Sequence, residues 1–182
     1  YWSDAGLPTA PWVVVSSSDA STAEAVEPPV VVKPSGEGSS VGVVLADTME
    51  EARRAIEHSL TQFDRVLVEK RLIGRELTVG ILGDRVLPIV EVRPAKGFYD
   101  FEAKYRRNDT EYIVEPDLDE TTVRQVQALA MKAYRVLGCR HYGRVDLILD
   151  ASAGPQLLEI NTVPGFTQHS LLPKAAARVG IG

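Results

Sequence analysis

Residues 143–161 read GRVDLILDASAGPQLLEIN and predict a β-hairpin. Apolar and polar residues alternate on both sides of a short polar turn, as they do in paired strands with one buried face. We expect the two strands at residues 142–150 and 155–160. Because side chains alternate between the two faces of a strand, Arg144 and Asp146 point the same way, away from the apolar residues beside them.

The polar face of this hairpin carries a candidate metal site. If Asp150 pairs with Pro155, then Asp146 lies opposite Glu159, and Asn161 follows on the same face. Two carboxylates directly across a ladder repel each other unless a cation lies between them. Magnesium prefers a few hard oxygen ligands, often one or two carboxylates with substrate phosphates, and an amide oxygen can complete the set. Spacing alone leaves a second interpretation open, a solvated hairpin face with a slipped register.

The rest of the chain predicts a mixture of strands and helices. We expect strands at residues 13–15, 30–33, 41–45 and 65–70, a hairpin over 75–92, and helices over 47–60, 119–137 and 170–180. Asp47 with Glu50 fits a capping box for the first helix. Asp119 and Ser170 are the expected N-caps of the other two. The fold class that follows is α+β.

Two further features indicate nucleotide chemistry. Residues 33–42 read KPSGEGSSVG, in which glycines let backbone amides approach an anion and serine hydroxyls add donors. The stretch lacks the GxxxxGK[ST] pattern of a P-loop, so a phosphate would lie under a hairpin flap. Glu69 and Glu76 bracket a crossover between two units, where a carboxylate can accept from an adenine amine or a ribose hydroxyl. An ordinary glycine-rich turn and two exposed salt-bridge partners are the alternatives.

Composition narrows the class of protein. The 182 residues are 45% hydrophobic and 25% charged, and the formal net charge of −5 argues against a general nucleic-acid binder. The apolar runs are too short for transmembrane helices, so we expect no membrane partner. One cysteine, Cys139, excludes an internal disulfide and favours a reducing, cytoplasmic location. The chain starts at Tyr1 without a leader, and we expect it to be cut from a longer protein.

Five motifs in one order resemble those of D-alanine-D-alanine ligase, a family of the ATP-grasp superfamily. They are KPSGEGSSVG, VLVEKRLIGRELTV, FYDFEAKY, GCRHYGRVDLILD and LLEINTVPGFTQHSLLPK. The resemblance implies two α+β subdomains, at residues 1–68 and 69–182, enclosing the nucleotide between antiparallel sheets. It also implies an ATP-dependent reaction in which an acyl phosphate of one D-alanine is attacked by the amine of another. The dipeptide serves peptidoglycan synthesis.

The resemblance assigns roles to residues of this chain. Those implied to contact ATP are Lys33, Ser40, Glu69, Lys70, Leu72, Glu76, Phe98 and Lys104. Asp146, Glu159 and Asn161 match the ligands of Mg²⁺, expected as two ions with Mn²⁺ as a substitute, which agrees with the hairpin argument. The catalytic groups implied are Ser39, Tyr105, Arg144 and the backbone of Gly165. Ser170 and Leu171 match the binding place of the second D-alanine's carboxylate.

The long polar and aromatic segment 93–116 acquires a role from the same resemblance. The family closes such a loop over its site, with Tyr105 hydrogen-bonded to Ser39, and the Lys104–Tyr105 pair marks enzymes that make the dipeptide rather than D-alanyl-D-lactate. The family's N-terminal domain, which holds the first D-alanine, has no counterpart here, and we expect the full-length enzyme to be a homodimer. The alternatives are an ATP-grasp ligase with another second substrate and a non-catalytic Mg-ATP-binding module.

Overall fold

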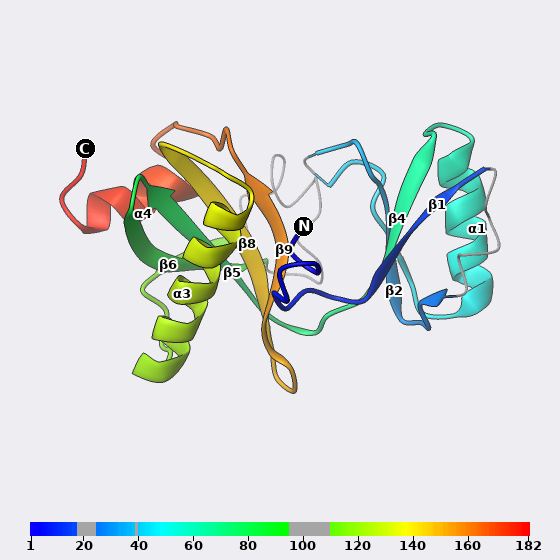
Figure 1. The fold of residues 1–182 in the computed structure, drawn as a ribbon, viewed down its shortest axis with the longest axis horizontal. Helices are drawn as coiled ribbons and strands as arrows, with labels where there is room; N and C mark the ends of the chain where they lie inside the picture. The colour runs from blue at the N-terminus through cyan, green and yellow to red at the C-terminus, as the bar shows by residue number, and fades with distance from the viewer. Residues whose placement is uncertain (18–24, 39, 95–109) are drawn as a thin grey trace. The chain divides into compact units, whose positions relative to one another are not determined.

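The structure, a computed structural model, describes residues 1–17, 25–38, 40–94 and 110–182 (Figure 1). Contacts group these residues into two compact units. The four-stranded unit comprises the described part of residues 10–72, and the five-stranded unit comprises residues 1–9 with the described part of 73–182. Neighbouring strands run antiparallel in each sheet, so the expected α+β class is confirmed. The expected subdomain boundary at residues 68 and 69 stays a prediction.

In its described residues, the four-stranded unit is a sheet with one helix against it. Its strands are β1 (Trp12–Ser16), β2 (Val30–Pro34), β3 (Val44–Ala46) and β4 (Arg65–Lys70), in the order β1-β4-β2-β3, and its helix is α1 (Met49–Leu60). Alternate valines of β2 and β4 pack with α1 in one buried cluster, which contains Val30, Val32, Val66, Val68, Ala52 and Ile56. The strand expected at residues 41–45 begins later, because Gly42 has a positive φ of 70° that an extended strand does not allow.

The N-terminus of α1 differs from the expectation by one residue. Thr48, not Asp47, is the N-cap, and its hydroxyl accepts a hydrogen bond from the backbone amide of Glu51 at 3.2 Å. The Glu51 carboxylate accepts in return from the amides of Thr48 and Asp47. The expected box of Asp47 with Glu50 is therefore wrong. Both spacings satisfy the motif, and Asp47 instead pairs with Arg71 at 3.1 Å.

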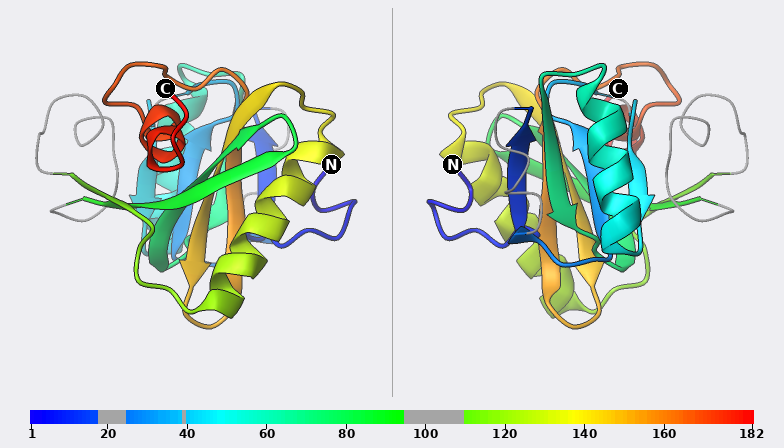
Figure 2. Two further views of the ribbon diagram at one scale, coloured as in Figure 1. Left: turned by 90° about the vertical axis from the view of Figure 1, so that its left-hand side faces the viewer. Right: turned by 90° about the vertical axis from the view of Figure 1, so that its right-hand side faces the viewer.

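The described part of the five-stranded unit has a sheet of more strands and two helices. Its strands are β5 (Gly74–Leu82), β6 (Arg85–Arg93), β7 (Glu111–Val114), β8 (Tyr142–Asp150) and β9 (Gly154–Asn161), in the order β7-β6-β5-β8-β9. The helices are α3 (Glu120–Val136) and α4 (Leu171–Arg178) (Figure 2). Ile89 packs in the α3 cluster and its neighbour Val90 in the α4 cluster, so the helices cover opposite faces of the sheet.

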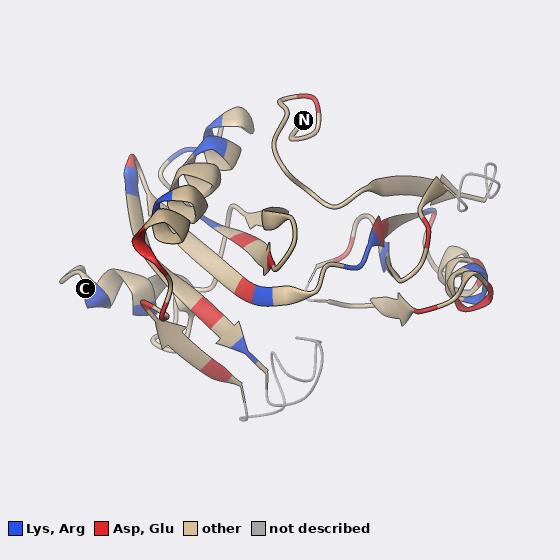
Figure 3. Ribbon diagram, turned by 90° about the horizontal axis from the view of Figure 1, so that it is seen from below, with Lys and Arg blue, Asp and Glu red and all other residues tan. Residues whose placement is uncertain are grey.

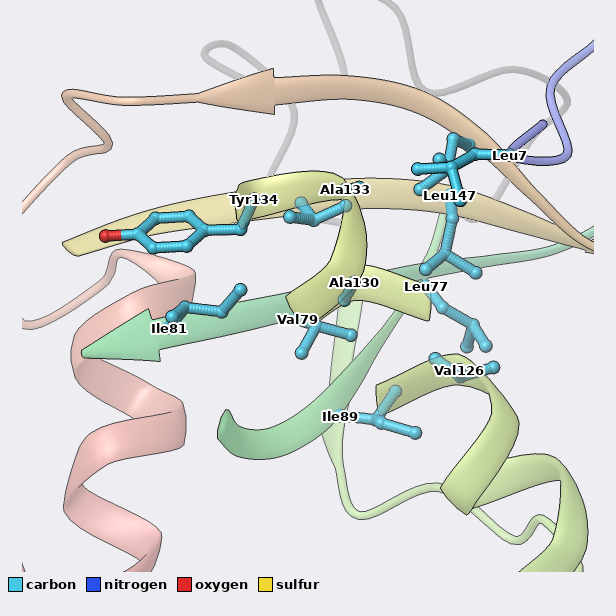
Figure 4. Packing of buried hydrophobic residues seen from close by; sticks show 12 residues of the cluster. Leu7, Leu77, Val79, Ile81, Ile89, Val126, Ala130, Ala133, Tyr134 and Leu147 are labelled. Carbon is cyan, nitrogen blue, oxygen red and sulfur yellow. The ribbon is translucent and has the colours of Figure 1, made fainter. Parts of the chain in front are cut away.

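The main core of this unit lies between α3 and the sheet. Leu77, Val79 and Ile81 of β5 belong to one buried cluster with Val126 and Ala130 of α3, whose side chains are labelled in Figure 4. The buried positions of α3 recur every three or four residues, which is the apolar stripe that the sequence predicts. In the described parts of the chain, no helix is both long enough and apolar enough to span a membrane.

Residues 1–9 belong to the five-stranded unit and run beside β9. The amide of Leu157 donates to the carbonyl of Pro8, and the Thr9 hydroxyl donates to the carbonyl of Leu157, each at 2.9 Å. Trp2 donates from its indole nitrogen to the carbonyl of Ala133 on α3. Both backbone groups of Leu157 are thus satisfied by this N-terminal segment, which fixes β9 just before its polar residues.

Candidate functional site

The predicted row of acidic residues exists on the five-stranded sheet. Asp146 on β8 lies directly opposite Glu159 on β9, and Arg144 lies opposite Asn161. This juxtaposition is confirmed. On its other side, Asp146 lies opposite Thr78 of β5, so one row crosses three strands. Acidic and basic positions lie side by side on strands of this sheet (Figure 3).

A β-bulge brings the two carboxylates together. Asp150 pairs with Gly154, not with Pro155 as expected, and Leu147 pairs with Leu157. If the pairing of Asp150 with Gly154 continued unchanged along the strands, Asp146 would lie opposite Leu158, and Glu159 would point to the opposite face of the sheet. One extra residue in β9 between the Leu147 and Asp146 pairs restores the predicted alignment. The expected pairing of Asp150 with Pro155 was therefore wrong, and the extra residue in the bulge brings Asp146 and Glu159 opposite each other all the same.

The turn of the hairpin has a clear cause. The Asp150 carboxylate accepts hydrogen bonds from the hydroxyl and amide of Ser152 and from the amide of Ala153, at 2.7 to 2.9 Å. These bonds, the Ser152 hydroxyl first, lower the pKa of Asp150 to about 2. Gly154 follows with a positive φ of 72°, which glycine adopts without strain. This tight turn pairs Asp150 with Gly154, one residue earlier than expected, and the bulge before Glu159 compensates for the shift.

Both carboxylate oxygens of Asp146 accept hydrogen bonds. Its Oδ1 accepts from Thr78 Oγ1 at 2.5 Å and from Arg144 Nε at 2.8 Å, and its Oδ2 accepts from an Arg144 terminal nitrogen at 2.6 Å. The Asp146 and Arg144 side chains are only 13% and 17% exposed. A two-bond pair of this kind fixes the planes of both groups. Thr78 was not a predicted site residue.

The donors in this row fit a hard divalent cation. Asp146 and Glu159 supply carboxylate oxygens from adjacent strands, and Asn161 adds an amide oxygen that accepts from the amide of Val163 at 3.1 Å. The described residues contain no group of three His, Cys, Asp or Glu side chains placed for a metal. Two carboxylates with an amide match Mg²⁺ sites in which substrate phosphates complete the coordination, rather than an all-protein cage.

The four-stranded unit carries a second group of predicted residues. Lys33 on β2 donates to Glu69 on β4 at 2.7 Å, with the two side chains 24% and 13% exposed. Lys70 donates to the carbonyls of Glu27 and Pro28, both at 3.0 Å. The ammonium of Lys33 is therefore held beside a carboxylate on the sheet face opposite α1, and that of Lys70 is held by backbone oxygens. Leu72, also predicted, is half-buried.

The glycine-rich stretch forms a turn with left-handed residues. Ser40 and Gly42 have φ values of 60° and 70°. A Cβ built on Gly42 would lie 2.9 Å from a ring carbon of Pro34, so this glycine permits both the conformation and the close approach. An open hollow of about 290 Å³ lies beside the turn, lined by residues 35–37 and 62–65. The predicted nucleotide residues of this unit do not line it.

The predicted substrate residues lie near the start of α4. Ser170 is its N-cap residue, but its hydroxyl accepts from the amide of Thr167 at 3.2 Å and makes no side-chain cap to the helix. The first amides of α4 thus have no serine cap, and such amides are suited to a carboxylate. Gly165 lies against Ser170, because a Cβ there would be 2.7 Å from the hydroxyl. Leu171 packs with the α4 cluster.

Of the remaining predicted site residues, the structure describes Glu76 and leaves four outside the described residues. Glu76 is half-buried on β5, two residues before Thr78 and therefore on the same face. Ser39, Phe98, Lys104 and Tyr105 lie outside the described residues. Thr78 could have been suspected from its spacing to Glu76, but its partner Asp146 lies 68 residues away. Local pattern does not give the register between β5 and β8.

The two antiparallel sheets, each with helical cover, form the ATP-grasp fold. The family model described as "D-ala D-ala ligase C-terminus" matches residues 1–182, and the chain belongs to this family. It is 42% identical to a D-alanine--D-alanine ligase of Hydrogenovibrio crunogenus, over 99% of the chain and 58% of that relative.

Two solved structures agree with the fold. The first is D-alanine--D-alanine ligase from Bacillus anthracis complexed with ATP, with a TM-score of 0.81 and 30% identity, over 98% of this chain and 58% of that one. The second is VanG D-Ala:D-Ser ligase from Enterococcus faecalis, with a TM-score of 0.85 and 28% identity, over 98% and 54%. The chain spans 54% to 58% of the length of these three proteins.

Proposed function

We propose that the chain is the ATP-grasp part of a ligase that joins two D-alanines, using ATP and Mg²⁺. The observation that carries this proposal is the row on β8 and β9, in which Asp146 faces Glu159 while Arg144 is held in two bonds by Asp146. Family membership over the whole chain supports the choice of reaction. The ATP complex of a similar structure supports the choice of nucleotide.

The proposed reaction needs positioned charges more than covalent chemistry. Lys33 binds phosphate oxygens, releasing its bond to Glu69, and the turn around Ser40 covers the transferred group with backbone amides. Asp146, Glu159 and Asn161 would hold Mg²⁺, which would neutralise charge on the phosphates. Glu76 accepts from ribose hydroxyls, and Glu69, Lys70 and Leu72 frame the adenine. By the motif resemblance, Phe98 lies against the adenine and Lys104 near the γ-phosphate.

Arg144 has a separate role in the proposed second step. In the first step the γ-phosphoryl group passes from ATP to the carboxylate of the first D-alanine, leaving ADP. When the amine of the second D-alanine attacks this acyl phosphate, negative charge develops on the carbonyl oxygen, and collapse of the tetrahedral intermediate expels inorganic phosphate. A guanidinium fixed by Asp146, together with the backbone amide of Gly165, stabilises that charge without reorganising. The uncapped amides after Ser170 bind the substrate carboxylate. Tyr105 and Ser39 close the loop and exclude water.

The proposal extends to the setting of the reaction. The product would enter peptidoglycan synthesis, the enzyme would act in the cytoplasm, and the complete ligase would be a homodimer that binds neither nucleic acid nor membrane. The enzyme would bind two Mg²⁺ ions, and Mn²⁺ would serve as a substitute for Mg²⁺. The motif resemblance supports these points, and light scattering of the complete ligase would test the dimer.

The reaction is tested by following ADP release from Mg-ATP with D-alanine, alone and with D-lactate or D-serine, and identifying products by mass. The chain and a chimera that supplies the part of the Hydrogenovibrio relative it does not span are both assayed. D-alanyl-D-alanine from the chimera is the expected result. A mixed product would favour a ligase with another second substrate, as the D-Ala:D-Ser neighbour suggests. Nucleotide binding without any turnover would favour a non-catalytic module.

A further inference from the structure

Thr78 is a buried hydroxyl aimed at a charged oxygen. It lies near the middle of β5 with 2% of its surface exposed, paired across the sheet with Val90 on β6 and Asp146 on β8. Its Oγ1 donates to Asp146 Oδ1 at 2.5 Å. Threonine is branched at Cβ and stiff at χ1, so a residue held by strands on both sides presents its hydroxyl in one direction.

The hydrogen bonds of Asp146 leave one direction open for a cation. A carboxylate oxygen accepts about two hydrogen bonds, and Oδ1 already accepts from Thr78 and from Arg144 Nε. Oδ2 accepts a single bond, from an Arg144 terminal nitrogen, among the hydrogen bonds of the described residues. Oδ2 is therefore the Asp146 oxygen with room for a further partner, and Glu159 lies opposite Asp146 on β9.

Thr78 ties the Asp146 carboxylate to a second strand, which the bonds from Arg144 do not. Two bonds from Arg144 fix the carboxylate relative to the guanidinium, but the pair can still turn together because both side chains are on β8. The bond from β5 ties the carboxylate to a second strand. Hydrogen-bond partners of metal ligands commonly set ligand orientation in this way, and losing one costs about 10- to 100-fold in metal affinity.

We propose that Thr78 is a positioning residue for the divalent cation, holding the Asp146 carboxylate so that its Oδ2 is presented to the metal. The inference rests on the proposed function, because it requires that Asp146 and Glu159 bind a cation with the nucleotide. Thr78 itself does not touch metal or substrate. Its hydroxyl acts through Asp146, and a hydroxyl of the same reach is sufficient.

Mn²⁺ binding tests the proposal independently of turnover. The free Mn²⁺ signal in electron paramagnetic resonance is titrated with the 182-residue chain in the presence of ATP, against a blank with the same ATP and no protein, because ATP itself binds Mn²⁺. Thr78→Val, which keeps the shape and removes the hydroxyl, should weaken Mn²⁺ binding by about 10-fold or more, and Thr78→Ser should remain within about 3-fold of the unchanged chain. Ser59→Ala, which removes another buried hydroxyl in the four-stranded unit, is the matched control and should bind normally.

A second measurement separates positioning from a structural role. ATP binding in EDTA and the melting temperature should be nearly the same for Thr78→Val and Thr78→Ser, and Thr78→Ala replaces the valine variant if that one does not fold. Unchanged Mn²⁺ affinity in the variant without a hydroxyl would overturn the inference while leaving the proposed function intact. Absence of Mn²⁺ binding by the unchanged chain with ATP would overturn both.

Discussion

Changing Glu91 to glutamine should lower the free energy of unfolding by about 2–3 kcal/mol at pH 7. Glu91 lies on β6 with its side chain only 5% exposed. Its two carboxylate oxygens accept from Arg75 at 2.9 and 2.8 Å, and one of them also accepts from Arg93 at 3.0 Å. The buried carboxylate is thus bound by two guanidinium groups.

The size of this loss depends on how well Arg75 and Arg93 are solvated or bonded once the Glu91 charge is removed. Removing one partner of a fully buried ion pair costs about 3–5 kcal/mol, because an unpaired charge stays behind. Here the Arg75 and Arg93 side chains are 36% and 55% exposed, so both can be hydrated by water. Glutamine also keeps one acceptor oxygen. The expected loss is therefore nearer that of one charge-assisted hydrogen bond, about 1.5–3 kcal/mol.

The effect should depend on pH in a defined direction. The hydrogen bond from Arg75, followed by the charges of Arg75 and Arg93, lowers the pKa of Glu91, while burial acts in the opposite sense. A lowered pKa gives stability that is complete above the pKa of unfolded glutamate, about 4.3, and is lost as the pH falls through the lower folded value. Glutamine does not titrate, so the difference between the two proteins should shrink on acidification.

Urea unfolding at pH 7 and at about pH 3.5 measures both quantities. Glu111→Gln is the matched control, because Glu111 meets Arg93 at 3.5 Å with 63% of its side chain exposed, and it should cost less than about 0.5 kcal/mol. A Glu91→Gln loss as small as that of the control would refute the reasoning. A difference that stays constant on acidification would refute its electrostatic part.

Three further changes test other parts of the account. Thr48→Ala removes the N-cap of α1 and should cost about 1 kcal/mol in thermal or urea unfolding, and no loss would mean that the box with Glu51 contributes nothing. Gly143→Ala would place a Cβ 2.9 Å from the buried ring of Tyr134, so we expect a loss of about 1–3 kcal/mol, and unchanged stability would show that the ring moves freely. Tyr105→Phe in the active chimera should slow turnover by about fivefold if the proposed loop closure uses its hydroxyl, and an unchanged rate would contradict that closure.

Much of the fold could be predicted because its signals are local. Alternation gave both strands of the β8–β9 hairpin, and the spacing of apolar residues gave α3 with Asp119 as its N-cap. The capping box of α1 was misplaced because consecutive residues, Asp47 and Thr48, both satisfy the spacing. Only the backbone conformation decides between them, and that depends on how the chain enters the helix.

Parts of the site depend on contacts between distant residues, which spacing does not encode. The prediction that Asp146 lies opposite Glu159 assumed a turn one residue longer than the observed one. The prediction is correct because a bulge in β9 compensates for the shorter turn. Thr78 was missed because the register of β5 on β8 joins residues 68 apart. The N-terminal segment, whose Thr9 bonds to Leu157, has no sequence signal for its place beside β9.

The most direct test of the central claim is calorimetric titration of ATP into the chain with Mg²⁺ and with EDTA, comparing the unchanged chain with Glu159→Gln. Glu120→Gln, an exposed change at the start of α3, is the control. Since Glu159 faces Asp146 across the ladder, we predict that Mg²⁺ tightens ATP binding in the unchanged chain and the control, and that Glu159→Gln loses this dependence while still binding ATP weakly in EDTA. Tight, Mg²⁺-dependent binding of ATP by Glu159→Gln would contradict the assignment of this row as the metal site.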